Sequence, residues 1–110
     1  MANSKLVKAP ENITTVVGTK SVSMTCSTNG SDPVNWKWKR NSNYSAFQSI
    51  FIGGTVGNLY KHKYAVTQTT TYTLTVVDVE YTDAGTFKCI DKGGQGPEEM
   101  DAELIVLGEC

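Results

Sequence analysis

The stretch from Thr82 to Cys89 reads TDAGTFKC. Asp83, Gly85, Phe87 and Cys89 stand at alternate positions. A period of two is that of a β-strand, so these four residues are expected to point to one side of a strand. An aspartate and a cysteine on the inner side of a strand need specific partners, because a buried charge is costly when it is unpaired. The rest of the chain must supply those partners.

The same alternation of apolar and polar residues runs through much of the chain. It is clearest in the segments 21–26 (SVSMTC), 34–40 (VNWKWKR), 72–79 (YTLTVVDV) and 102–107 (AELIVL). Turn-forming stretches such as NGSDP, NSN, GGTVGN and GGQGP separate the alternating segments. This pattern predicts an all-β protein, an antiparallel sandwich or barrel, with one short helical turn near 79–82.

Size, charge and cysteine content narrow the class of protein. The chain has 110 residues and a net charge of −1, which fits a single domain and gives no sign of a nucleic-acid partner. The N-terminal segment MANSKLVKAP lacks the apolar stretch of a signal peptide, and we expect the chain to be a piece of a longer protein. The three cysteines, Cys26, Cys89 and Cys110, lack the C-x-x-C spacing of zinc and redox sites.

A linked series of residues resembles the signature of the immunoglobulin superfamily. Cys26 closes the strand SVSMTC, and Trp38 follows after eleven intervening residues. Leu74-x-Val76-x-x-Val79-x-x-x-Asp83-x-Gly85-x-Phe87-x-Cys89 completes the series. The resemblance covers nearly all of the chain. It implies a two-sheet Greek-key immunoglobulin sandwich occupying residues 1–110, with 1–8 as an N-terminal lead-in and 108–110 as a C-terminal tail.

The resemblance also implies roles for the core residues. Cys26 and Cys89 would form a disulfide between the sheets with a tryptophan packed against it, and Leu74 would belong to the same core. Trp36 and Trp38 share a face, and the eleven-residue gap favours Trp38 for the place on the disulfide. Phe87 takes the position of the tyrosine corner without its hydroxyl group.

Two further family positions concern the start of the strand that carries Cys89. Asp83 would pair with a basic residue of the strand called D in this family. Lys61 and Lys63 are the candidates, and Lys63 is preferred because it directly precedes the strand YAVT. Gly85 would allow a tight turn into strand F.

The length of the central part of the chain resembles a variable-type domain. Fifty residues lie between Trp38 and Cys89, and the run FQSIFI (47–52) leaves room for the strands called C′ and C″. The stretch from Gly93 to Gly96 is either a joining-segment-like bulge or a glycine-rich turn between strands F and G. Under the second interpretation strand G is Met100–Leu107. Cys110 fits a hinge residue or a link to a second chain.

The resemblance places a binding surface on the sheet called GFCC′. Alternation puts Lys37, Lys39, Lys88 and Ile90 on its outer side, and the strand 47–52 adds either Phe47, Ser49 and Phe51 or Gln48, Ile50 and Ile52. From these we expect an interface of Lys37, Lys39, Lys88, Ile90, Ile50 and Phe51, with Glu99 or Glu103 meeting the lysines of a partner. The other interpretation of the lysines is a solvated surface.

The expected function is protein recognition by an immune-receptor-like module, as a homodimer or a pair of V domains. The alternatives are a cell-adhesion module with a different partner, and a domain whose loops 27–33, 53–58 and 91–98 bind carbohydrate or a microbial ligand. No P-loop or zinc motif occurs in the sequence, and the one histidine, His62, fits an exposed strand position. We therefore expect no enzyme activity and no cofactor or metal. A solvated hairpin edge explains the acidic cluster better than a calcium site does; the cluster consists of Glu98, Glu99, Asp101 and Glu103.

Three sequons bear on the compartment. They begin at Asn12, Asn29 and Asn43 and are either chance matches or glycosylation sites. Together with the expected disulfide they predict a secreted protein or the outer part of a cell-surface protein.

Overall fold

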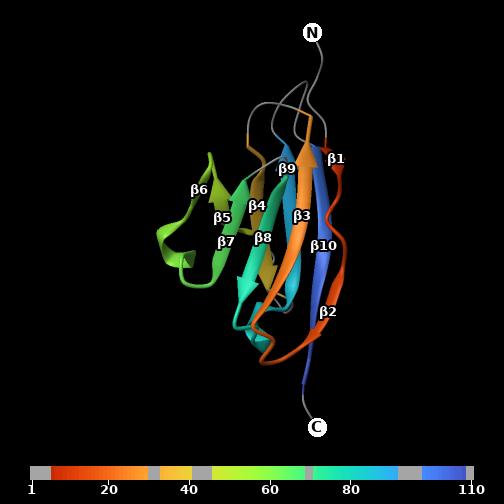
Figure 1. Cartoon of the computed structure of the whole chain (residues 1–110), viewed down its shortest axis with the longest axis vertical. Helices are drawn as coiled ribbons and strands as arrows, with labels where there is room; N and C mark the ends of the chain where they lie inside the picture. Colours follow the sequence, from red (N-terminus) through yellow and green to blue (C-terminus); the bar gives the residue numbers. More distant parts are fainter. Residues whose placement is uncertain (1–5, 30–32, 41–45, 69–70, 92–97, 109–110) are drawn as a thin grey trace.

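The computed structural model describes residues 6–29, 33–40, 46–68, 71–91 and 98–108. They form a two-sheet β-sandwich with two short 3-10 helices (Figure 1). The elements in chain order are β1 (Leu6–Lys8), β2 (Ile13–Val16), β3 (Ser21–Thr28), β4 (Asn35–Arg40), β5 (Gln48–Ile52), β6 (Thr55–Val56), η1 (Asn58–Tyr60), β7 (Tyr64–Gln68), β8 (Tyr72–Val77), η2 (Tyr81–Asp83), β9 (Gly85–Asp91) and β10 (Glu98–Leu107).

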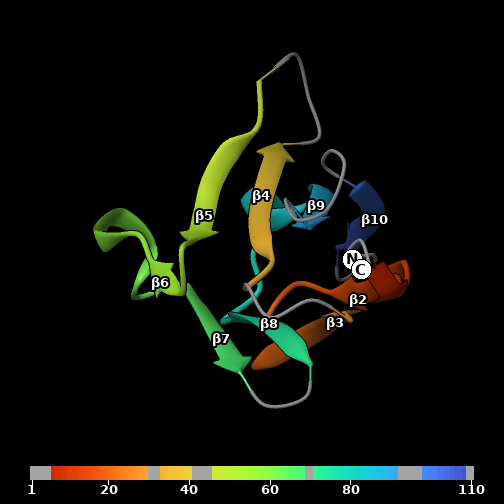
Figure 2. The same cartoon turned by 90° about the horizontal axis from the view of Figure 1, so that it is seen from above.

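The two sheets have strand orders β1-β3-β8-β7 and β2-β10-β9-β4-β5-β6. Figure 2 shows them as two layers, with β7, β8 and β3 facing the layer that runs from β5 through β4 and β9 to β10. All pairs are antiparallel except β2 with β10, which run parallel. The all-β sandwich predicted from the alternating segments is confirmed, and β5 and β6 extend the larger sheet beyond β4.

Two elements differ from the sequence expectations. The sequence predicts no strand within the N-terminal lead-in 1–8, but Leu6–Lys8 form β1 and pair with β3. A three-residue strand is too short to show an alternating pattern. A helical turn was expected near 79–82 and is found as η2, whereas η1 has no counterpart among the expectations.

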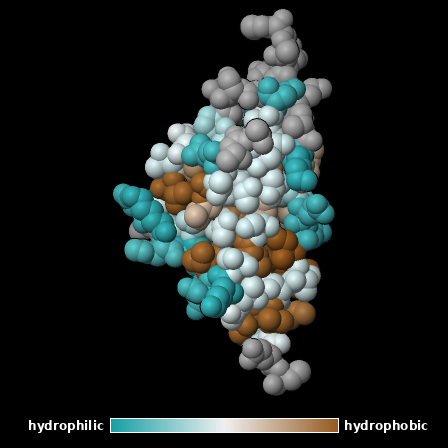
Figure 3. Space-filling view, viewed as in Figure 1, coloured by the Kyte–Doolittle hydropathy of each residue, from teal (hydrophilic) through white to brown (hydrophobic). Residues whose placement is uncertain are grey.

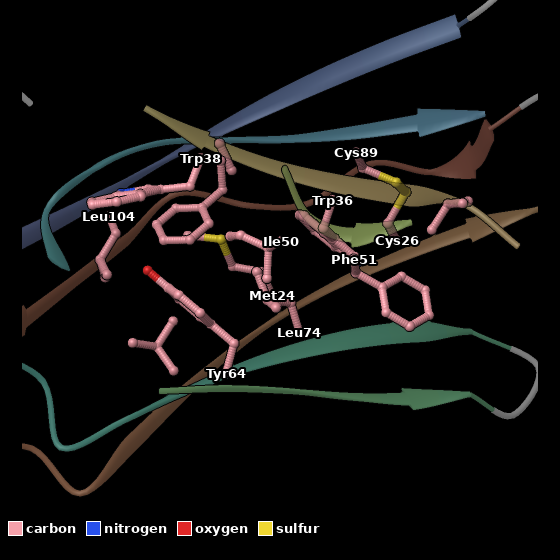
Figure 4. Packing of buried hydrophobic residues seen from close by; sticks show 14 of the residues in the cluster. Met24, Cys26, Trp36, Trp38, Ile50, Phe51, Tyr64, Leu74, Cys89 and Leu104 are labelled. Carbon is pink, nitrogen blue, oxygen red and sulfur yellow. A yellow bond between two sulfur atoms is a disulfide. The ribbon is translucent and has the colours of Figure 1, made fainter. Parts of the chain in front are cut away.

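The core lies between the sheets, and its largest members are aromatic (Figure 4). Cys26 and Cys89 are fully buried and joined by a disulfide with a Cα–Cα distance of 6.5 Å. Leu74 and Phe87 are also fully buried, as expected. Alternation along β3, β4, β8 and β9 directs these side chains inward, which explains why the segments with a period of two became the core strands.

The eleven-residue gap predicts the wrong tryptophan for the place on the disulfide. Trp36, not Trp38, stands in register with Cys89, and Figure 4 shows it beside the disulfide. Trp38 lies opposite Phe87, with ring centroids 6.4 Å apart, and near Tyr64 at 6.5 Å. A count of residues after Cys26 measures the loop as well as the strands, whereas strand register decides which side chain reaches the sulfur atoms.

Candidate functional site

The outer side of the larger sheet carries most of the charged side chains singled out in the sequence. Trp36 and Trp38 point into the core, so Lys37 between them and Lys39 after them point outward. We call this surface the lysine face. It is formed by Lys37 and Lys39 on β4, Phe47 just before β5, Ser49 on β5, Thr86 and Lys88 on β9, and Glu99, Asp101 and Glu103 on β10.

An aromatic ring holds two of the lysines together. The Nζ atoms of Lys39 and Lys88 lie 5.2 and 4.3 Å from the centroid of the Phe47 ring. Such cation–π contacts contribute about 0.5–1 kcal/mol each at exposed sites. Phe47 therefore gives the lysine face an apolar centre that is bordered by positive charge.

Carboxylates of β10 border the lysines on the other side. Lys88 Nζ lies 3.0 Å from Glu99 Oε1. Thr86 Oγ1 donates a hydrogen bond of 2.6 Å to Glu103 Oε1, and the Glu103 backbone N–H donates to Asn12 Oδ1 at 2.9 Å. Glu99 thus meets a lysine of its own chain, while Asp101 between the two glutamates is exposed.

Three residues expected in the interface are buried instead. Ile50 and Phe51 are each 1% exposed, because the pairing of β4 with β5 contains a bulge. Trp36 pairs with Phe51 and Lys37 pairs with Ser49, so the extra residue Ile50 turns into the core beside Phe51. The bulge also explains why neither expected set of alternating residues in 47–52 lies wholly on the outer side.

Ile90 is the third correction. Alternation places it on the same side as Lys88, but it lies between Asn35 and Glu99 in the sheet and is only 6% exposed. Alternation predicts the side of the sheet to which a residue points and not what covers it there.

An ion pair between a partly exposed lysine and a buried aspartate supports the end of the sandwich at which η2 lies. Lys63 Nζ lies 2.8 Å from Asp83 Oδ2 and also donates to the backbone carbonyl of Asp78. Asp83 Oδ2 accepts a hydrogen bond of 2.7 Å from the Glu80 backbone N–H as part of a capping box at η2. Of the two lysines considered from the sequence, Lys63 is therefore the one beside Asp83.

Gly85 has a role other than the expected turn. It is the first residue of β9 and pairs with Arg40, with a φ of 154°. A Cβ atom at this position would lie 2.1 Å from the carbonyl oxygen of Lys39. Gly85 therefore allows β9 to approach the end of β4 closely.

Polar residues that sequence reasoning missed are buried at the opposite end. Asn35 and Asp91 are 6% and 3% exposed. Thr28 Oγ1 donates a hydrogen bond to Asp91, and the Gly53 backbone N–H donates to Asn35 Oδ1 at 3.3 Å. The first contact joins the ends of β3 and β9, and the second joins the start of β4 to the β5–β6 turn. A polar residue within an otherwise apolar strand was the signal in the sequence that could have identified them.

Several expected sites fall partly outside the described residues. Asn12 and Asn29 are exposed, whereas Asn43 lies outside the described ranges. The same applies to Cys110, to the stretch from Gly93 to Gly96 and to parts of the loops 27–33 and 91–98.

Apolar surface gathers where β10 ends (lower part of Figure 3). Leu107 is 50% exposed and Val16, its register partner on β2, is 46% exposed. Tyr81 lies against Gly108, and an open groove of about 540 Å³ runs between Val17 and Tyr81.

None of the helices in the described ranges is long and apolar enough to cross a membrane.

The sequence of the chain matches the family model of the immunoglobulin domain over residues 5–91. The chain belongs to the immunoglobulin domain family. Domains of this family generally act as binding modules rather than as enzymes, which agrees with an outer surface built of charged strands around one aromatic ring.

Solved structures of titin domains have a similar fold. The I-band fragment I67–I69 from titin is 25% identical with a TM-score of 0.68, and the alignment covers 98% of this chain and 34% of that one. The chain thus spans about a third of that fragment. The complex of titin M10 with an obscurin-like 1 immunoglobulin domain is 16% identical with a TM-score of 0.68, covering 98% and 97% of the two chains. A comparison with curated protein sequences finds no match.

Proposed function

We propose that this immunoglobulin domain acts by non-covalent protein recognition through the lysine face, and that its partner is a second copy of the chain. The observation that carries the proposal is the arrangement of Lys39 and Lys88 around Phe47 beside the acidic strand β10. An interface commonly has an apolar centre with a polar rim, and Phe47 with its lysines has this composition.

Charge supports a partner that carries both signs. The lysines of β4 and the carboxylates of β10 lie on one surface, separated only by β9. A uniformly acidic partner would be repelled by β10, whereas a second copy offers a positive strand to β10 and a negative strand to β4.

The subtype that we propose is the variable type, as an immune-receptor-like module. It is supported by β5, which lies in the run 47–52 expected to leave room for strand C′, and by β6, which extends the same sheet within the segment 53–58 that was expected to be a loop. In the antigen receptors that the chain resembles, paired chains carry aromatic residues at the positions of Lys39 and Lys88. Lysines at both positions favour a pairing geometry different from that of receptor light and heavy chains.

An extracellular location completes the proposal. The buried Cys26–Cys89 disulfide is of the kind that forms in oxidising compartments. The exposed sequon residues Asn12 and Asn29 are accessible for glycosylation.

Sedimentation equilibrium tests the proposal, with Cys110→Ser as the background so that the thiol cannot link two chains. Lys39→Glu should raise the dimer dissociation constant at least ~10-fold, since it places a negative charge in the centre of the interface. Lys61→Glu makes the same change of charge on an exposed residue outside the lysine face and should leave the constant within about twofold.

Two results would contradict self-recognition. One is a background protein that remains monomeric at several hundred micromolar, and the other is an equal effect of the two variants. A monomer that binds a different surface protein through Lys39 would instead indicate the cell-adhesion alternative.

A further inference from the structure

Strand register places opposite charges at equal distances from β9. Asp101 on β10 is the register partner of Lys88 on β9, and Lys88 is the register partner of Lys37 on β4. The three residues form one row on the lysine face. Neighbouring strands are about 4.8 Å apart, so Asp101 and Lys37 lie on opposite sides of β9 with their Cα atoms roughly 10 Å apart.

The other charges of the lysine face already have partners within the chain. Lys88 contacts Glu99 and the Phe47 ring, Lys39 contacts the same ring, and Glu103 accepts the Thr86 hydrogen bond. In the part of the chain that the structure describes, neither Lys37 nor Asp101 forms an ion pair. One positive and one negative side chain of the same row are thus available to a partner.

We propose that two copies pair face to face about a two-fold axis parallel to β9, so that Asp101 of each copy meets Lys37 of the other. This inference rests on the proposed function and adds the geometry of the pair. Rotation by 180° about such an axis keeps each row at its own level and exchanges the two sides of β9. It therefore brings β10 of one copy over β4 of the other and forms two equivalent ion pairs.

The alternative two-fold axis in the plane of the interface is disfavoured by charge. An axis perpendicular to the strands would place β10 over β10 and β4 over β4. Carboxylates would then face carboxylates and lysines would face lysines, which costs several kcal/mol in an interface. The preferred axis passes over Lys88, so the two Lys88 side chains face each other, and Glu99, 3.0 Å from Lys88 Nζ within each copy, offsets their charge.

Complementary charge variants test this arrangement in the Cys110→Ser background. Lys37→Asp alone and Asp101→Lys alone each turn both attractive contacts of the dimer into repulsive ones. Each variant should raise the dissociation constant at least ~10-fold. In an equimolar mixture of the two variants every contact is again between opposite charges. The mixture should therefore form a 1:1 heterodimer with a dissociation constant within about threefold of the unsubstituted background protein.

The mixture also separates this inference from the proposed function. Near-ultraviolet circular dichroism first verifies that both variants are folded. A mixture that stays as weakly associated as its components would overturn the two-fold arrangement, even where Lys39→Glu still disrupts the background dimer and upholds the lysine face. A background protein that does not associate at all would overturn both.

Discussion

Lys63 and Asp83 connect the two sheets at the lower end of the sandwich, with Lys63 Nζ 2.8 Å from Asp83 Oδ2. Lys63 precedes β7 of the smaller sheet, and Asp83 ends η2, which leads into β9 of the larger sheet. The Asp83 side chain is 6% exposed, and its Oδ2 atom contacts both Lys63 and the Glu80 backbone N–H.

Removal of the cation should therefore be costly. We expect Lys63→Met to lower the free energy of unfolding by about 3 kcal/mol, because it leaves a buried carboxylate without its ion-pair partner. Lys61→Met, two residues earlier at an exposed position, should change it by less than ~0.5 kcal/mol. Urea unfolding measures both, and equal effects of the two substitutions would contradict the structural role of the pair.

Two glycines with positive φ should respond differently to a methyl group. At Gly85 a Cβ would lie 2.1 Å from the Lys39 carbonyl oxygen, whereas at Gly53 a Cβ would meet nothing within 4 Å. Gly85→Ala should destabilise the domain by at least ~3 kcal/mol through a backbone clash. Gly53→Ala should cost about 1 kcal/mol, the strain of a left-handed residue alone. A similar midpoint in thermal unfolding for both variants would show that β9 does not approach β4 as described.

Alkaline pH should destabilise the domain through Tyr64. This residue is 5% exposed, and its burial and then the nearby negative charge of Asp83 raise the pKa of the phenol above its ordinary value of 10.0. The unfolded chain therefore loses this proton near pH 10 while the folded chain keeps it. The contribution of the protonated Tyr64 phenol to the free energy of unfolding is fully present below pH 10. Above pH 10 it falls by at most about 1.4 kcal/mol per pH unit.

Tyr64→Phe isolates this effect, because it removes the phenol hydroxyl and leaves the other side chains of the protein unchanged. Between pH 9 and 11.5 its free energy of unfolding should fall less steeply than that of the unsubstituted chain. Parallel curves would show that Tyr64 ionises in the folded protein as easily as in the unfolded one.

Phe47 and Phe51 should separate recognition from folding. Phe51→Ala removes a side chain that is 1% exposed and should lower the free energy of unfolding by about 3–5 kcal/mol. Phe47→Ala removes the ring between two lysines, which should cost about 1–2 kcal/mol of stability and weaken self-association at least ~10-fold. Calorimetry measures the two losses of stability, and sedimentation measures the change in self-association. A larger loss of stability for Phe47→Ala than for Phe51→Ala would contradict the bulge between β4 and β5.

The sequence was sufficient where one local rule decides the structure. Alternation identified the strands that carry Cys26, Trp36 and Cys89, since burial of one sheet face imposes a period of two. The linked series from Cys26 to Cys89 pointed to the immunoglobulin domain family because those residues have to meet across the core.

Features that depend on how strands pair were not predictable. The bulge that turns Ile50 and Phe51 inward arises from the register between β4 and β5, which a single strand does not encode. The position of Trp36 on the disulfide depends in the same way on the register with β9. The Phe47 cluster joins a residue before β5 to Lys88 on β9, and no sequence spacing relates these two positions.

Recognition through the lysine face is tested most directly by following backbone amide resonances of the Cys110→Ser protein as its concentration rises. Self-recognition through this face predicts concentration-dependent shifts at Lys37, Lys39, Lys88 and Asp101, with Thr73 and Thr75 on the opposite sheet unchanged. Shifts that concentrate on β3, β7 and β8, or spectra that stay constant to several hundred micromolar, would contradict self-recognition through this face.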